Sequence, residues 1–178
     1  MAVHPINVRL SRSDLARAEQ AAALRWQLAR AANVKDKLID TSSTGAESDL
    51  AGIKAEIAVS KLLDVDFEAT ALGIDNGCDM YASAGKHEIA IQVKSCKAPS
   101  SRWMLGTPHQ RLCWDVAIFV RPTEDNTVME VYGWMGKKEY EHRVETVDLG
   151  HGDGPGVKID HLRDIEEFWR MMNEKRCA

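Results

Sequence analysis

Three polar side chains on two neighbouring segments have the types and the spacing for catalysis on a phosphodiester bond. Asp79 precedes a turn-like stretch at residues 83–86, and Gln92 and Lys94 lie in the apolar segment after it. If the chain turns at Gly85 and Lys86, residues whose numbers sum to 171 face each other, so Asp79 faces Gln92. Lys94 lies two residues farther along and therefore on the same face. We expect a carboxylate, an amide oxygen and an ammonium group to converge there.

These groups suit metal-assisted hydrolysis. Mg²⁺ prefers oxygen ligands, typically one or two carboxylates together with water and substrate phosphate. Asp79 would supply a charged ligand and Gln92 a neutral carbonyl oxygen. A bound metal lowers the pKa of its water and stabilises charge on the scissile phosphate. Lys94 can orient or deprotonate that water, or stabilise the transition state.

A fourth candidate, Glu56, lies within an expected helix that begins near a capping box formed by Thr44 and Glu47. Gly52 and Glu56 are four residues apart and share one face of this helix. We expect the glycine to allow close approach to the sheet, so that Glu56 reaches the metal directly or through water. Glu56 also falls near the apolar stripe, where an unpaired acid is costly.

The pattern resembles the PD-(D/E)xK nuclease superfamily, which has the restriction-endonuclease-like fold. The matching stretches are the helix at residues 52–63, Gly77-Cys-Asp-Met and Ile91-Gln-Val-Lys-Ser. The resemblance implies that Glu56, Asp79, Gln92 and Lys94 are catalytic, that Asp79, Glu56 and Gln92 bind Mg²⁺ or Mn²⁺, and that the substrate is DNA or, less often, RNA. Residues 133–138 are also similar to short nucleases encoded by phages and mobile elements.

Gln92 departs from the family pattern, in which glutamate is commoner. The amide removes one negative charge, so we expect weaker metal affinity and a greater dependence on Glu56. Such variants occur in the family, and they include inactive relatives. Two readings therefore stay open, an active nuclease and a relative that lost its chemistry.

The charge distribution supports contact with phosphates. The whole chain carries a formal charge of −4, but residues 85–111 contain five Lys or Arg and one acid. A basic segment on an acidic body suits local phosphate contact without indiscriminate binding. From it we select four nucleic-acid-binding candidates: Lys97, Arg102 and Arg111 for phosphates, and Trp103 for stacking on a base.

The elements that must position these residues follow from the apolar periodicity. Helices are expected at residues 14–32, 44–63 and 165–174, and strands at 67–70, 78–82, 87–96, 114–121 and 128–135. The glycine-rich stretch 150–156 is expected to be a loop. The order helix, helix, β-meander, helix predicts an α/β sandwich with a mixed central sheet flanked by helices. We expect a single domain over residues 1–178, with residues 1–45 as a helical extension and 46–178 as the catalytic core.

Composition narrows the class further. The chain is 44% hydrophobic and 28% charged, which is ordinary for a globular protein. It has no apolar run of transmembrane length and no secretory signal pattern, so we expect a soluble cytoplasmic protein without membrane contact. Its four cysteines show no metal or disulfide spacing.

The leading hypothesis is a Mg²⁺-dependent DNA endonuclease, either junction-resolving or restriction-type, acting as a homodimer through the N-terminal helix. One alternative is a catalytically inactive nucleic-acid-binding or accessory protein with the same fold. A third is a protein-interaction module that uses the acidic C-terminal third, where residues 139–174 contain ten acids and four Lys or Arg.

Overall fold

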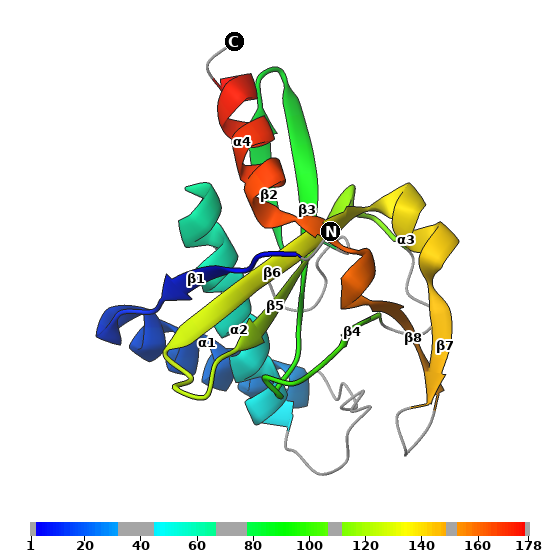
Figure 1. Cartoon of the computed structure of the whole chain (residues 1–178). Coiled ribbons are helices and arrows are strands. Elements are labelled where there is room, and N and C mark those ends of the chain that lie inside the picture. Colours follow the sequence, from blue (N-terminus) through cyan, green and yellow to red (C-terminus); the bar gives the residue numbers. More distant parts are fainter. Residues whose placement is uncertain (1–2, 32–44, 67–77, 107–111, 149–152, 177–178) are drawn as a thin grey trace.

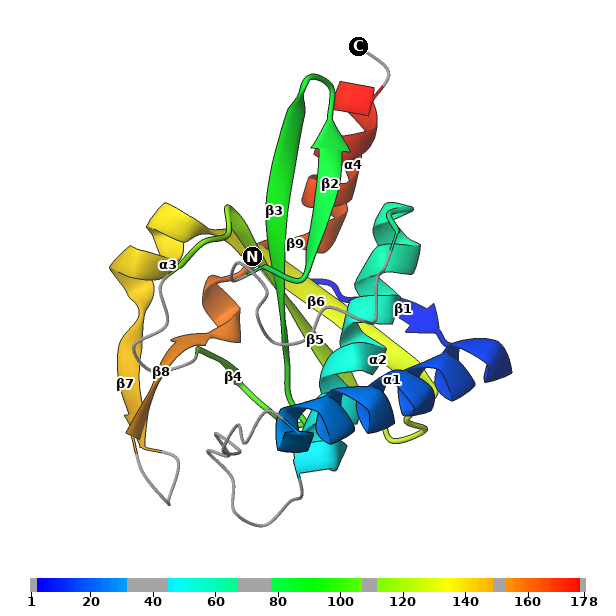
Figure 2. The same ribbon diagram turned by 180° about the vertical axis from the view of Figure 1, so that it is seen from behind.

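The computed structural model describes residues 3–31, 45–66, 78–106, 112–148 and 153–176. The expected strand at 67–70, the Thr44 cap, Arg111 and residues 150–152 lie outside these ranges. Two sheets and four helices make up the described chain (Figures 1 and 2). No helix in these ranges is both long and apolar enough to cross a membrane.

The larger sheet has six strands and is mixed. Its order is β1-β6-β5-β3-β2, and a short strand β9 also pairs with β6. The bounds are β1 (Ile6–Arg9), β2 (Met80–Ala84), β3 (His87–Ser95), β5 (Val116–Pro122), β6 (Val128–Gly136) and β9 (Arg163–Asp164). The α/β class and the mixed sheet are confirmed. The β-meander is wrong, because β3 and β5 run parallel, whereas a meander is antiparallel throughout.

The predicted register of the first hairpin is confirmed. Met80 pairs with Ile91 and Ala84 with His87, so the paired numbers sum to 171. The two-residue loop carries a positive φ of 64° at Gly85 and not at Lys86, which is the pattern of a type II′ turn. This turn needs a glycine at its first central position, so Gly85 fixes the register of the whole hairpin.

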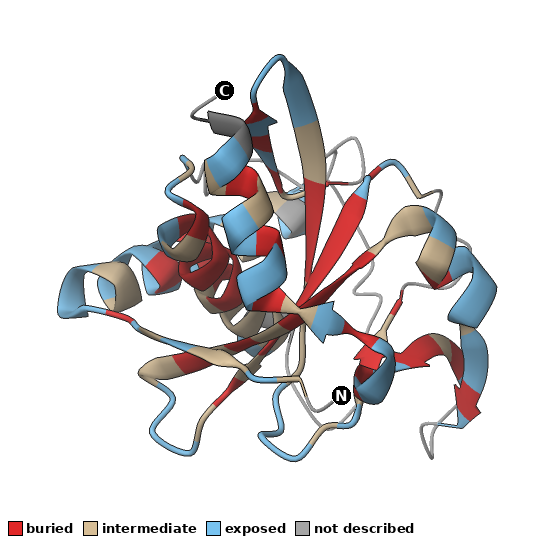
Figure 3. Cartoon of the chain, turned by 45° about the horizontal axis from the view of Figure 1, so that its top comes forward, coloured by how far each residue is buried: buried red, intermediate tan, exposed pale blue. Residues whose placement is uncertain are grey.

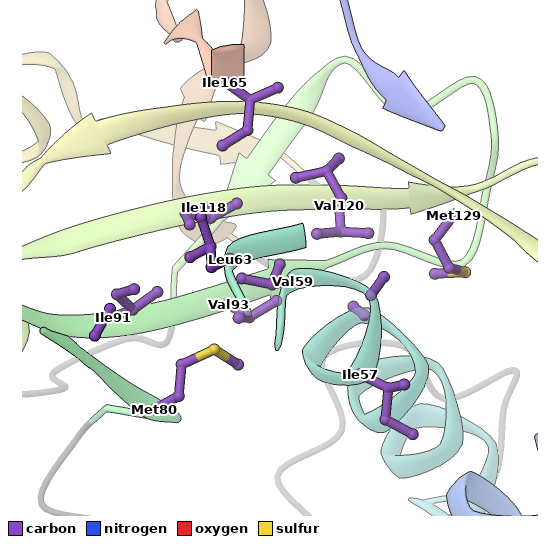
Figure 4. Packing of buried hydrophobic residues seen from close by; sticks show 14 of the residues in the cluster. Ile57, Val59, Leu63, Met80, Ile91, Val93, Ile118, Val120, Met129 and Ile165 are labelled. Atoms are coloured by element: carbon purple, nitrogen blue, oxygen red, sulfur yellow. The ribbon is translucent and has the colours of Figure 1, made fainter. Parts of the chain in front are cut away.

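Helices cover one face of this sheet. The helices α1 (Arg12–Ala31), α2 (Gly45–Leu63) and α4 (Ile165–Arg176) contribute to one buried cluster with the sheet. Figure 4 shows Val59 and Leu63 of α2 near Val93 of β3 and Ile118 of β5. In Figure 3 the buried residues follow the centre of the sheet and the inner sides of these helices.

The N-terminal segment belongs to this core. Ala18, Ala21 and Ala22 of α1 are buried against α2, and β1, which the sequence did not suggest, extends the sheet beside β6. A capping box begins α1, because the Ser11 hydroxyl accepts from Asp14 N (3.1 Å) and Asp14 Oδ2 accepts from Ser11 N (2.8 Å). The helix α1, which lies within residues 1–45, supplies part of the central packing.

A second sheet lies on the opposite face. Its order is β4-β8-β7, formed by β4 (Trp103–Leu105), β7 (Glu145–Asp148) and β8 (Asp153–Lys158). With the short helix α3 (Lys137–Arg143) and a 3₁₀ turn at Ile159–His161 it encloses a second buried cluster. This second sheet was not predicted from the sequence, because β8 contains Asp-Gly-Pro-Gly, a composition typical of loops.

Gly156 explains why a strand of that composition forms there. A Cβ at this position would lie 2.9 Å from Val147 Cγ2 and 3.1 Å from Leu105 Cδ2. The close approach of the neighbouring strands therefore requires glycine, although glycine weakens an isolated strand. Asp153 to Gly156 form the first part of β8, so the expected loop is wrong for these residues.

Candidate functional site

The hairpin brings Asp79 and Gln92 into contact. Asp79 directly precedes β2, and its Oδ2 accepts hydrogen bonds from the Gln92 side-chain amide and from Val93 N, the latter at 2.6 Å. Asp79 N donates to Ile91 O at 2.8 Å. The Asp79 carboxylate thus accepts a hydrogen bond from a backbone N–H of β3 at the point where β2 begins. This hydrogen bond holds it beside Gln92.

Gln92 is buried, with 6% of its surface exposed. Its Oε1 is also buried and has no hydrogen-bond partner within the described ranges. A buried acceptor without a partner costs free energy, and a water or an ion is one group that can satisfy it. The residue types present, a fixed carboxylate beside an amide oxygen that lacks a partner, fit a hard cation.

Glu56 lies in α2 and is engaged by a residue that the sequence did not single out. Arg25 of α1 donates to both carboxylate oxygens, with Nη1 to Oε1 at 3.1 Å and Nη2 to Oε2 at 2.9 Å. The two side chains are 23% and 8% exposed. This is a largely buried, two-pronged ion pair, the strongest geometry available to arginine and a carboxylate.

Arg25 connects Glu56 electrostatically with Asp79. Burial lowers the pKa of the Arg25 guanidinium, but the hydrogen bonds and charge of Glu56 raise it, as do the charges of Asp79 and Asp49. The net effect is a pKa above the ordinary value. Arg25 therefore remains a cation and serves as counter-ion to several acids on different elements. Its Nε is buried and has no partner in the described chain.

One sequence signal could have revealed Arg25. It follows Ala18, Ala21 and Ala22 at spacings of seven, four and three residues, so it lies on the buried stripe of α1. A charged residue on the buried side of a helix requires a partner. Glu56 likewise lies on the buried side of α2. Their pairing spans 31 residues and cannot be derived from local periodicity.

Gly52 has a different role from the one expected. A Cβ built there would find only Glu56 Oε1, at 4.0 Å, and no atom of the sheet within that distance. The expectation that Gly52 permits close approach of the helix to the sheet is therefore wrong. The glycine leaves ordinary van der Waals space beside the Glu56 carboxylate.

Lys94 is half-buried on β3, two residues beyond Gln92, and pairs with Phe119 of β5. Gln92 and Lys94 alternate along the strand with Ile91 and Val93, which belong to the core shared with α2. Asp79, Gln92 and Lys94 thus come from one hairpin, as expected, whereas Glu56 is positioned by the helical layer.

The nucleic-acid-binding candidates lie after β3. Lys97 and Arg102 are exposed, and Trp103 is half-buried in β4. Lys158 Nζ of the adjacent strand lies 5.3 Å from the centre of the Trp103 ring. Part of that ring is therefore paired with a cation of the same chain.

No group of three or more His, Cys, Asp or Glu side chains within the described ranges is arranged to hold a metal ion. No protein-family model matches the sequence. No curated protein matches it either.

Proposed function

We propose that this chain is a Mg²⁺-dependent DNA endonuclease of the restriction-endonuclease-like, PD-(D/E)xK type. Asp79 would bind the metal, with Gln92 and Glu56 as further ligands and Lys94 at the attacking water. The observation that carries the proposal is the contact between Asp79 and Gln92, together with the buried Oε1 of Gln92, which has no hydrogen-bond partner among the residues that the structure describes. Oxygen donors of this kind suit Mg²⁺ or Mn²⁺.

The proposal has two geometric requirements. Arg25 must release Glu56, because it holds both oxygens of that carboxylate. The second requirement concerns Gln92. Gln92 now presents its NH₂ group to Asp79, and an NH₂ group cannot ligate a cation. Metal binding through both residues requires the amide to turn so that Oε1 faces the ion. The turn removes one hydrogen bond from Asp79, but Val93 N still donates to its carboxylate.

The test is cleavage of a four-way junction, a linear duplex and a single strand with Mg²⁺ or Mn²⁺. Wild-type protein is compared with Lys94→Ala and Asp79→Asn. Lys86→Ala is the matched control, because Lys86 is an exposed lysine at the turn of the same hairpin. We expect both site variants to lose at least a hundredfold in rate and the control to cut like wild type. Cleavage that survives in Asp79→Asn and Lys94→Ala would refute the assignment.

A second function is favoured by the ion pair of Glu56. Arg25 occupies both oxygens of this acid, and Gln92 stands where a carboxylate would add charge. The charges of Asp79, Glu56, Arg25 and Lys94 therefore cancel, which disfavours a divalent cation. These features suit a non-catalytic nucleic-acid-binding protein. It predicts salt-dependent DNA binding that neither needs Mg²⁺ nor changes in Lys94→Ala.

Within the nuclease proposal the active form is a homodimer, because cutting two strands usually requires two active sites. The helix α1 is the proposed contact surface. Its Leu24 is 39% exposed, one of the few large apolar side chains left exposed in the described chain. Light scattering of wild type and Leu24→Lys tests this. A strict monomer in both proteins would contradict the dimer.

A further inference from the structure

An open depression of about 480 Å³ lies where β6 ends and α3 begins. Four of its lining residues, Trp134, Gly136, Lys137 and Lys138, come from the stretch 133–138 that the sequence analysis singled out. In Figures 1 and 2 the helix α3 continues from the end of β6. None of these residues has a role in the proposed metal site.

The lining has an excess of available positive charge. Three cations, Lys137, Lys138 and Arg163, line it together with two acids. Glu139 is paired with Arg163 at 3.1 Å and with Arg143 at 3.3 Å. The other acid, Asp115, accepts from Ala90 N through Oδ2 at 3.0 Å. Lys137 Nζ donates to Leu112 O at 2.5 Å. Because this acceptor is a neutral carbonyl, it does not neutralise the positive charge of the lysine. Lys138 is exposed and has no hydrogen bond or ion pair within the described ranges. Such cations suit an anionic ligand.

Arg163 is held in a fixed orientation. Its guanidinium carbon lies 5.0 Å from the centre of the Trp134 ring, and its Nε donates to Glu139 Oε2. An arginine that is stacked and hydrogen-bonded in this way loses little freedom on binding, and its planar donors match a phosphate group.

Asp115 links the depression to β3, the strand that carries Gln92. Asp115 lines the depression, accepts from Lys137 N through its backbone oxygen (2.9 Å), and accepts from Ala90 N through Oδ2 (3.0 Å). Ala90 precedes Gln92 by two residues, a step of about 6.6 Å along a strand.

We propose that this depression binds a backbone phosphate of the nucleic-acid strand, with Lys138 and Arg163 as its ligands. The strand crosses β3 beside Ala90 on its way to the Asp79–Gln92 pair. The inference rests on the proposed function for the identity of the ligand. It adds a phosphate site outside the basic segment at residues 85–111.

The test is binding of a fluorescein-labelled twelve-nucleotide single strand in EDTA, followed by fluorescence anisotropy over a range of salt concentrations. Lys138→Ala is compared with wild type and with Arg9→Ala, which removes one exposed cation from the far edge strand β1. Arg163→Lys keeps the charge and removes the planar donors. Melting temperatures verify that each variant is folded.

We expect Lys138→Ala to weaken binding about tenfold and to reduce the slope of log affinity against log salt by about one. Arg163→Lys should weaken binding and keep the slope, and Arg9→Ala should leave both unchanged. Equal affinity and slope in wild type and Lys138→Ala would overturn the inference. Displacement of the probe by AMP as readily as by unlabelled strand would also overturn it, because the site would then take a free nucleotide.

Cleavage with Mg²⁺, measured in parallel, separates this inference from the proposed function. Lys138-dependent binding without any cleavage leaves the phosphate site standing and refutes the nuclease. Metal-dependent cleavage together with binding that does not depend on Lys138 supports the nuclease and refutes the phosphate site.

Discussion

Arg25 of α1 holds both carboxylate oxygens of Glu56 of α2, and this pair joins the two helices at a largely buried position. Removing one partner of a buried pair leaves an uncompensated charge, which is costlier than losing the contact itself. We therefore expect Arg25→Ala to lower the free energy of unfolding by about 3 kcal/mol. Urea denaturation measures this.

The control for that variant is the exposed pair of Arg170 and Glu166, whose side chains are 64% and 55% exposed. Arg170→Ala should leave the denaturation midpoint unchanged, because exposed pairs contribute little. The double variant Arg25→Met with Glu56→Leu should recover most of the stability lost in Arg25→Ala. A double variant as unstable as Arg25→Ala would contradict the role assigned to the unpaired Glu56 charge.

Replacing Gln92 by glutamate should make stability dependent on metal. Without metal, the new carboxylate faces Asp79, and the amide donor to Asp79 is lost. We expect the metal-free protein to lose about 2 kcal/mol. Mn²⁺ should then raise the melting temperature of Gln92→Glu more than that of wild type, since two carboxylates attract the ion. An equal Mn²⁺ effect in both proteins would argue against a cation at Asp79.

Gly156 and Gly136 should respond differently to alanine. At Gly156 the added Cβ lies 2.9 Å from Val147 Cγ2, whereas at Gly136 no atom lies within 4 Å. We expect Gly156→Ala to cost about 2 kcal/mol through overpacking. Gly136→Ala should cost little. Thermal unfolding of both variants tests whether the second sheet packs as described, and similar melting temperatures would contradict it.

Asp14 should make the anchoring of α1 dependent on pH. Burial raises its pKa, but Lys61, at 2.6 Å, and Ser11 lower it, and the net pKa lies below the ordinary value of 3.8. A depressed pKa means that the stabilisation is complete above the ordinary value and is lost as pH falls through the folded-state value. Asp14→Asn should thus be less stable than wild type at pH 7. The difference should shrink as pH falls below 3.8 and vanish only below the folded-state pKa, as followed by urea denaturation across pH. A constant difference down to pH 2 would contradict this.

The sequence predicted best what depends on local geometry. A two-residue loop with Gly85 fixes the register, so the contact of Asp79 with Gln92 follows from residue numbers alone. Prediction from the sequence failed for contacts between segments that are far apart in the chain. Arg25 and Glu56 pair across two helices, and β3 pairs in parallel with β5 because the intervening chain leaves to form β4. The strand β8 was missed because only its tertiary surroundings reveal why Gly156 must be a glycine.

The pairing of β1 with β6 also has a consequence for the order in which parts of the fold can form during translation. Ile6 pairs with Val131, and Arg9 with Val128. During synthesis β1 leaves the ribosome long before its partner strand exists. In that interval α1 and α2 can already join through Arg25 and Glu56, since both helices precede β2. Because β1 pairs with β6, the β1 edge of the larger sheet can be completed only after the chain has been translated through β6 (Val128–Gly136).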